Sequence, residues 1–166
     1  ILQDSQSRIK SMALVHEILY YSHGVFQINL TQYTQSLATT LFHTYNAAAS
    51  LIHLDLDIQP DIMINLDQAI PCGLILNELI TNALKYGFTQ PKDRTLLIKL
   101  RKDDDHKVRI EVTNPGDTLS KKFDVSSVKT LGLQLVTTLV TQLRGNVSIV
   151  RGDRTTFIID FFDVLQ

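Results

Sequence analysis

The chain has 166 residues, of which 44% are apolar and 20% are charged, and its formal net charge is −1 at pH 7. These values are typical of one soluble globular domain, with or without an appendage, and they argue against broad affinity for nucleic acids or anionic membranes. The single cysteine, Cys72, excludes a disulfide framework and a cysteine-based zinc cluster, and no apolar run reaches the roughly 20 residues of a membrane span.

The first part of the chain is predicted to be helical. Apolar residues recur at three- and four-residue steps over Ile1–Tyr21, which predicts an amphipathic helix. Ser22–Asn29 is expected to be a loop, and Leu30–His53 a second helix with Thr31 as its N-cap. The two helices could pair with each other or with a second copy of the chain. Because the chain begins at Ile1 inside a helical pattern, without a methionine or a visible signal peptide, we expect a fragment of a longer protein.

The period of the pattern changes after the second helix. Leu54–Ile58 and Ile62–Leu66 flank Gln59-Pro60-Asp61, which predicts two short strands around a turn. A further helix follows, for which Asp67 is the expected N-cap and Gly87 the end.

This third helix carries an unusual polar stripe. Its core stretch, Pro71–Phe88, is apolar enough to be buried nearly all round, yet Glu78, Asn82 and Lys85 lie on one edge at positions i, i+4 and i+7. The stripe is either a solvated edge with a Glu–Lys pair or a metal and polyphosphate site. In the second case Asn82 offers a hard oxygen to Mg²⁺, Lys85 neutralises phosphate charge, and Glu78 orients or deprotonates a water or hydroxyl.

A clear hairpin comes next. Apolar and polar residues alternate over Leu96–Arg101 and Val108–Thr113, and the acidic run Asp103–Asp105 between them is expected to be a solvated turn. The second strand ends at Asn114-Pro115-Gly116. The residues that follow, Thr118–Thr130, have no helical or strand period, and a loop of this length in a small domain is typically functional or mobile.

The last part of the chain predicts one more helix and a closing hairpin. The helix covers Leu131–Leu143, with Gly132 in its first turn, where glycine permits either a close approach by a phosphate or tight packing against another helix. Val147–Val150 and Thr155–Phe162 are expected to be strands. The order of elements favours a two-layer α/β (α+β) sandwich, in which helices cover one face of a mixed, mostly antiparallel sheet, preceded by an N-terminal helical segment.

The motifs, in this order, resemble the ATP-binding domain of sensor histidine kinases. The resemblance rests on NELITNALKY in the third helix, a strand ending in NPG, a long loop, a helix with TLGLQLV and a closing hairpin with TTF. It implies the Bergerat-type fold of the GHKL ATPase superfamily. SRIKSMALVHEILY, near the start of the chain, is similar to the downstream part of the dimerisation and phosphotransfer helices. The resemblance implies a division into residues 1–29, from that helical region, and 30–166, the catalytic domain.

The N box of the family matches Asn77–Tyr86. The match implies that Asn82 is the Mg²⁺ ligand and that Glu78 is the acid–base or water-orienting carboxylate. It also implies that Lys85 contacts the nucleotide phosphates, with Tyr86 beside it at the nucleotide.

The two glycine boxes and the closing hairpin match as well. Thr113–Gly116 resembles the G1 box, which recognises adenine, and the G2 box contributes contacts near the phosphates. Asp117–Thr130 is similar to the ATP lid, with Phe123 as a candidate anchor. In the strand Thr155–Phe161, one threonine matches the position that helps to hold adenine through water. The nucleotide contacts implied in these segments are Asn114, Gly116, Leu131, Gly132, Leu133 and Thr156.

The chain departs from the family pattern at three positions, and it lacks the motif of the phosphoacceptor helix. Asn114 replaces the adenine-recognising aspartate, so that a donating NH₂ group accompanies the accepting oxygen and nucleotide preference could change. Thr118 and Thr155 replace glycines. His16 matches a position in the helix after the phosphoacceptor helix and is expected to have a packing role, so that no acceptor histidine is expected in this chain.

The activity implied by the resemblance is transfer of the γ-phosphate of ATP, with Mg²⁺, to a histidine upstream of this chain, for relay to a response regulator with a receiver domain. The alternative is an inactive ATP-binding or scaffold module of the same fold, such as a pseudokinase or an anti-sigma-like protein. A third interpretation is a helical interaction protein in which the polar stripe is structural. A homodimer through the N-terminal helices and a cytoplasmic location are also implied.

Overall fold

Five strands form one mixed sheet in the computed structural model, which describes residues 9, 13, 27–46, 52–88, 94–115 and 131–164. The strands, in their order across the sheet, are β2 (His53–Ile58), β4 (Thr95–Lys102), β5 (Lys107–Pro115), β7 (Arg154–Phe162) and β6 (Asn146–Arg151). β2 and β4 are parallel, and the other neighbours are antiparallel. The predicted mixed, mostly antiparallel sheet is therefore confirmed.

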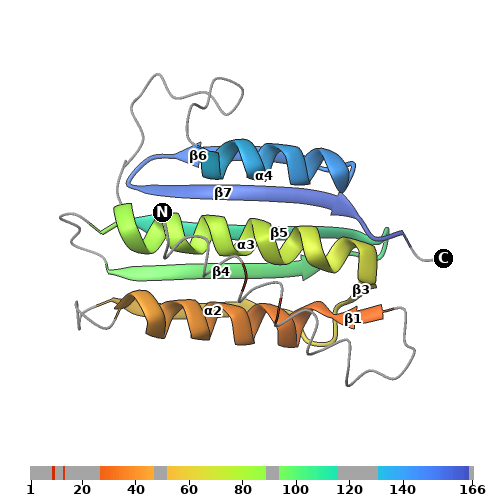
Figure 1. Ribbon diagram of the computed structural model, residues 1–166, viewed down its shortest axis with the longest axis horizontal. Coiled ribbons are helices and arrows are strands. Elements are labelled where there is room, and N and C mark those ends of the chain that lie inside the picture. Colours follow the sequence, from red (N-terminus) through yellow and green to blue (C-terminus); the bar gives the residue numbers. More distant parts are fainter. Residues whose placement is uncertain are drawn as a thin grey trace.

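Three helices cover one face of this sheet (Figure 1). They are α2 (Leu30–Asn46), α3 (Leu66–Tyr86) and α4 (Leu131–Gln142), with α3 in the middle. Every second residue of β4 and β5 is buried beneath them, among them Leu96, Ile98, Val108 and Ile110, which are fully buried. The two-residue period of the strands thus meets the apolar faces of the helices in one core, as the predicted sandwich requires.

The two predicted strands around Gln59-Pro60-Asp61 are present, but they do not pair with each other as a hairpin would. β2 joins the large sheet, whereas β3 (Met63–Asn65) pairs with the short strand β1 (Gln27–Asn29) in a separate two-stranded sheet. The backbone of the turn bonds to the start of α2 instead of to itself. Leu30 N donates to Ile62 O at 2.8 Å, and the Thr31 hydroxyl donates to Gln59 O at 2.7 Å and accepts from Ile62 N at 3.0 Å.

Both predicted N-caps are also wrong, each by two residues. Asn29 caps α2, since its Oδ1 accepts from Gln32 N at 3.0 Å, and the Thr31 hydroxyl is used by the turn. Asn65 caps α3, since its Oδ1 accepts from Asp67 N at 3.0 Å. The end of α3 at Gly87 is confirmed.

The second helix is shorter than expected. The described part of α2 is Leu30–Asn46, residues 47–51 lie outside the described residues, and His53 belongs to β2, where its backbone N–H donates to Arg94 O at the start of the parallel ladder. In the predicted first helix, Ile1–Tyr21, only Ile9 and Ala13 are described, and both are helical and exposed. No helix in the described part of the chain has the length and hydropathy that a membrane crossing requires.

The hairpin of β4 and β5 is confirmed, with Leu100 opposite Ile110. Its acidic turn is exposed, and Asp103 Oδ1 organises the turn by accepting from the backbone N–H groups of Asp105 and Lys107. No group of three histidine, cysteine, aspartate or glutamate side chains in the described residues is placed to hold a metal ion.

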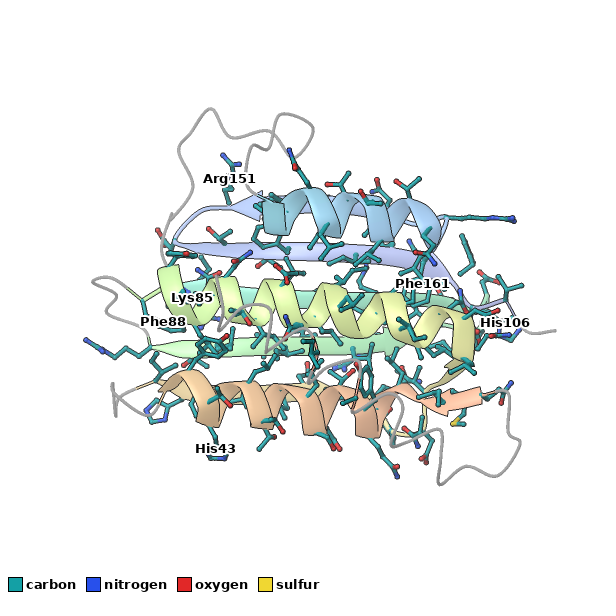
Figure 2. The ribbon with its side chains drawn as sticks, viewed as in Figure 1. His43, Lys85, Phe88, His106, Arg151 and Phe161 are labelled. Carbon is teal, nitrogen blue, oxygen red and sulfur yellow. The ribbon has the colours of Figure 1, made fainter. Side chains whose placement is uncertain are left out.

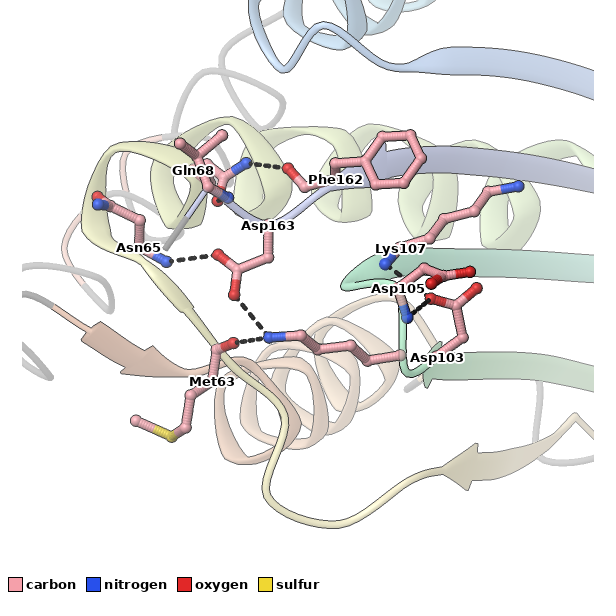
Figure 3. A network of polar contacts seen from close by, with 10 residues as sticks. Met63, Asn65, Gln68, Asp103, Asp105, Lys107, Phe162 and Asp163 are labelled. Atoms are coloured by element: carbon pink, nitrogen blue, oxygen red, sulfur yellow. Dashed lines mark hydrogen bonds and ion pairs between the residues drawn. The ribbon is translucent and has the colours of Figure 1, made fainter. Parts of the chain in front are cut away.

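A buried ion pair fastens the end of the chain to the start of α3 (Figure 3). Lys102 Nζ donates to Asp163 Oδ2 at 2.6 Å and to Met63 O at 3.0 Å, while Asn65 N donates to Asp163 Oδ1 at 3.3 Å. The side chain of Asp163 is fully buried. Gln68 adds a hydrogen bond from its amide to Phe162 O at 2.8 Å. These contacts fix the beginning of the helix that carries the polar stripe.

Candidate active site

One end of the sandwich gathers the segments that the sequence motifs single out. α3 ends here, β5 ends here, β7 starts here and α4 starts here (Figure 1). Figure 2 places Lys85, Phe88 and Arg151 at this end, and His106 and Phe161 at the opposite end. The antiparallel strands and the direction of the helices therefore bring together residues that are far apart in the sequence.

Glu78 lies buried in α3 and faces the start of α4. Glu78 is only 7% exposed, and the side-chain amide of Asn77 donates to Glu78 Oε1 at 3.4 Å. A β-carbon at Gly132 would lie 2.6 Å from Glu78 Oε2 and 3.8 Å from Asn82 Nδ2. Because β-carbons do not approach other atoms to 2.6 Å, only glycine at residue 132 permits this packing of α4 on α3. The glycine is thus explained by close helix packing onto the polar stripe itself.

The stripe is not a solvated edge. Glu78 is buried, and Asn82 and Lys85 are half-buried. Lys85 Nζ lies 5.4 Å from the centroid of the Tyr45 ring, near the end of α2. The neighbouring Tyr86 is 60% exposed at the end of α3. A buried carboxylate, an amide and an ammonium therefore share one edge of a core helix.

Asn114 lies beneath the end of α3. It is 4% exposed, and its Nδ2 donates to Pro115 O at 3.2 Å. A β-carbon at Gly87 would lie 2.7 Å from Asn114 Nδ2 and 2.6 Å from Ala83 O, so the glycine that ends α3 also lets the chain pass over Asn114. The donated hydrogen bond orients the amide of Asn114, and its oxygen is left as the group that can accept.

The cross-strand register of β5 and β7 places two residues that differ from the family pattern, Asn114 and Thr155, opposite each other. Asn114 is opposite Thr155, which is fully buried, and Thr113 is opposite Thr156. The hydroxyls of Thr113 and Thr156 are 2.9 Å apart and share a hydrogen bond. The side chain at residue 155 and the amide at residue 114 thus occupy adjacent places in the sheet.

The remaining predicted site residues are placed only in part. Leu133 is 7% exposed and packs in the core. Leu131 begins α4, but its side chain is outside the described part of the structure. Gly116, the candidate lid Asp117–Thr130 with Phe123 and Thr118, and His16 also lie outside the described residues.

Sequence analysis missed four residues of this region: Tyr45, Asn77, Gly87 as a neighbour of Asn114, and Thr113 as the partner of Thr156. Asn77 precedes Glu78 inside the polar motif, which is a signal that could have found it. Tyr45 carries no such signal, because its place in an apolar helical face predicts only packing.

Comparisons with known families agree with this geometry. Residues 1–45 match a family model described as histidine kinase, and residues 67–165 match the model described as histidine kinase-, DNA gyrase B-, and HSP90-like ATPase. The comparison with curated protein sequences returned no match.

Solved structures share the fold at low identity. The histidine kinase domain of the Erythrobacter litoralis EL346 blue-light activated histidine kinase matches with a TM-score of 0.85 and 19% identity over 95% of this chain and 74% of that one. A second structure of that kinase matches with a TM-score of 0.81 and 19% identity. The match covers 94% of this chain and 52% of the chain in that structure. The Acinetobacter baumannii histidine kinase AdeS matches with a TM-score of 0.66 and 14% identity over 95% of this chain and 77% of that one. The chain belongs to the histidine kinase-, DNA gyrase B-, and HSP90-like ATPase family, as the ATPase domain of a sensor histidine kinase.

Proposed function

We propose that this domain binds ATP together with Mg²⁺ and transfers the γ-phosphate to a histidine upstream of the chain, for relay to the receiver domain of a response regulator. The observation that carries the proposal is the packing of Gly132 against Glu78 and Asn82. It joins the start of α4 to the polar stripe of α3, at the end of the fold where Asn114 and Thr156 also lie. A nucleotide placed at this end meets groups suited to its base and to its phosphates.

The charges at this end of the fold support an anionic ligand. Four cations lie at this end: Lys85 near the end of α3, Arg94 just before β4, and Arg151 and Arg154 around the β6–β7 turn. Among the described residues of that turn, Asp153 is the acidic one. The N-terminus of α4 adds the partial positive charge of a helix. The opposite end carries the acidic turn Asp103–Asp105. This asymmetry favours approach of a polyphosphate to the candidate site.

The residues have separable roles in the proposed reaction. The Asn82 amide oxygen suits Mg²⁺, which takes few protein ligands and completes its shell with phosphate and water oxygens, and the bound ion would offset phosphate charge. Lys85 binds phosphate oxygens. Glu78, held by Asn77, orients the attacking group or accepts its proton. Asn114 accepts the amino group of adenine through its oxygen. Positioning and charge stabilisation supply most of the rate in such a transfer.

The partners follow from the same proposal. The phosphate acceptor is a histidine of a dimerisation and phosphotransfer region to which residues 1–29 contribute, and residues 30–166 form the catalytic unit. Two copies associate through the N-terminal helices, and the domain acts in the cytoplasm. An inactive ATP-binding or scaffold module is the second candidate, and the buried Asn114 amide, which donates where the family pattern has an aspartate, is the feature that favours it.

Calorimetric titration with Mg²⁺ and ATP tests the proposal. We expect micromolar binding that weakens at least tenfold, about 1.4 kcal/mol, in Asn82→Ala. Asn146→Ala is the matched control, because Asn146 is exposed at the other end of the fold, at the start of β6, and its loss leaves affinity unchanged. Binding without phosphorylation of the full-length protein by γ-labelled ATP would favour the scaffold candidate. Absence of ATP binding would refute the proposed kinase activity and leave the scaffold module as the leading candidate.

A further inference from the structure

Tyr45 brings α2 into the candidate site, although every residue of the nucleotide-binding motifs lies on α3 or on later elements. Its ring lies 5.4 Å from Lys85 Nζ, measured to the ring centroid. The contact has a structural origin. α2 follows β1 directly and α3 follows β3 directly, and these two strands are paired. Figure 1 shows that the two helices start at the same end of the fold, run in the same direction, and end at the candidate site.

The hydroxyl of Tyr45 does not explain why a tyrosine occupies this position. It is buried, and it has no hydrogen-bond partner in the part of the chain that the structure describes. A buried hydroxyl without a partner among the described residues adds no favourable contact to the site. The face of the ring, in contrast, has a partner. An ammonium within about 6 Å of an aromatic centroid is attracted by the negative charge of the ring face.

We propose that Tyr45 is a positioning residue for nucleotide phosphate, because its ring holds the Lys85 ammonium at the end of α3 in the place from which it binds phosphate. The inference rests on the proposed function. A lysine side chain loses much rotamer freedom when it is fixed, and a contact made before the ligand arrives reduces that loss on binding. The ammonium carries three N–H donors and contacts the ring with one side only. Its other donors can therefore bind phosphate while the contact with the ring is kept.

The position of Lys85 on α3 agrees with this role. It lies one turn beyond Asn82 and on the same stripe as Glu78, so a phosphate chain that extends from Asn82 along the stripe reaches Lys85 next. Tyr45 approaches from the α2 side, whereas Gly132 approaches the stripe from the α4 side. The ring thus supports the ammonium without occupying the side of the stripe where α4 begins.

The test compares ligands with and without phosphates. We expect Tyr45→Leu to weaken ATP and ADP binding about three- to tenfold, as the strength of such contacts implies, and to leave adenosine binding unchanged. Tyr45→Phe keeps the ring and is expected to bind all three ligands as the wild type does. In a Lys85→Ala background, Tyr45→Leu is expected to have no further effect on ATP.

A packing control separates the ring from general helix contacts. Leu37 is 3% exposed on the same helix, and Leu37→Ala is expected to lower stability while the ratio of ATP to adenosine affinity stays at the wild-type value. If Leu37→Ala changes that ratio as Tyr45→Leu does, helix packing and not the ring is responsible, and the proposal is overturned. Equal weakening of ATP and adenosine by Tyr45→Leu, or no weakening of ATP, also overturns it.

Nuclear magnetic resonance of the wild type keeps the proposal testable if a variant does not fold. The ε-methylene protons of Lys85 are expected to show an upfield ring-current shift that persists when ATP is added. Loss of the shift on ATP addition means that the lysine leaves the ring to bind phosphate, which overturns the positioning role. A wild type that binds adenosine but not ATP, or no nucleotide at all, refutes the proposed function as well, so the two failures are distinguishable.

Discussion

The α-carbon of Gly132 lies against the carboxylate of Glu78, so close that a β-carbon at residue 132 would be 2.6 Å from Oε2. The contact joins the first turn of α4 to the middle of α3. It requires glycine on one helix and fixes the position of a buried acid on the other. Changes at residue 132 should therefore act on the chemistry of the site before they act on the fold.

Gly132→Ala is expected to lower nucleotide binding and phosphotransfer while the domain stays folded. The atom that a new β-carbon meets is the far end of a flexible side chain, so Glu78 can move away and lose its contact with Asn77. Alanine also favours a helix over glycine by about 1 kcal/mol, which offsets part of the strain. Titration with ATP and a thermal unfolding curve measure the two effects separately.

Gly152→Ala is the matched control, because a β-carbon at Gly152 meets nothing within 4 Å in the β6–β7 turn. It should leave ATP affinity unchanged. If Gly132→Ala unfolds the domain, or if both variants bind ATP as the wild type does, the close packing at residue 132 does not have the proposed consequence.

Asn114→Asp is expected to destabilise the domain instead of restoring a better site. The amide donates to Pro115 O at 3.2 Å in a buried position, and a carboxylate would place an acceptor against that carbonyl. Loss of a buried hydrogen bond that leaves its partner unpaired costs about 1–3 kcal/mol. Urea denaturation measures this loss. An aspartate variant that is equally stable and binds ATP more tightly would show that the amide is not matched to Pro115.

Asp163→Asn is expected to cost about 3 kcal/mol or more in unfolding free energy, because it leaves the largely buried Lys102 without its charge partner. Asp57→Asn removes the exposed ion pair with Arg101, whose side chains are 45% and 46% exposed, and should cost far less than Asp163→Asn. Denaturant unfolding of both variants gives the comparison. Similar losses in the two variants would mean that burial does not distinguish the pairs.

Cys72 should resist thiol reagents in the folded domain. It is fully buried in α3, and this burial, together with the charge of Asp163, raises the pKa of its thiol. The reactive thiolate is therefore suppressed, and labelling should be roughly a thousandfold or more slower than in the unfolded chain. Labelling at increasing urea measures the opening of α3, and ATP should slow it. Fast labelling in buffer alone would contradict the packing around Cys72.

Asp160 should contribute to stability only when it is ionised. Hydrogen bonds from Arg109, with its charge, lower the pKa of Asp160 in the fold, and Lys107 adds to the effect. Its contribution is therefore present above the unfolded-state pKa, about 4, and is lost as the pH falls through the folded-state value. Asp160→Asn should cost about 1 kcal/mol or less at pH 7, and the cost should vanish near pH 2. A cost that does not change with pH would contradict this assignment.

Local patterns in the sequence predicted most elements and the residues of the stripe. The two-residue period identified β4 and β5, the three- and four-residue period identified α3 and α4, and NELITNALKY placed Glu78, Asn82 and Lys85 on one edge. These predictions succeed because burial of one face follows from residue spacing alone. The order of motifs also indicated the family, which the match over residues 67–165 confirms.

Only the tertiary structure decided which of these segments touch. Nothing in the spacing around Gln59 shows that β3 pairs with β1 and β2 with β4, because these partners are distant in sequence. The bonds that Thr31 makes to the turn are also contacts between distant segments. Likewise, the register that places Asn114 opposite Thr155 is set by the pairing of whole strands. Spacing determines which side of an element is apolar, whereas the partner of that side is selected by packing among elements distant in sequence. The contacts of Gly132 with Glu78 and of Tyr45 with Lys85 exist for that reason.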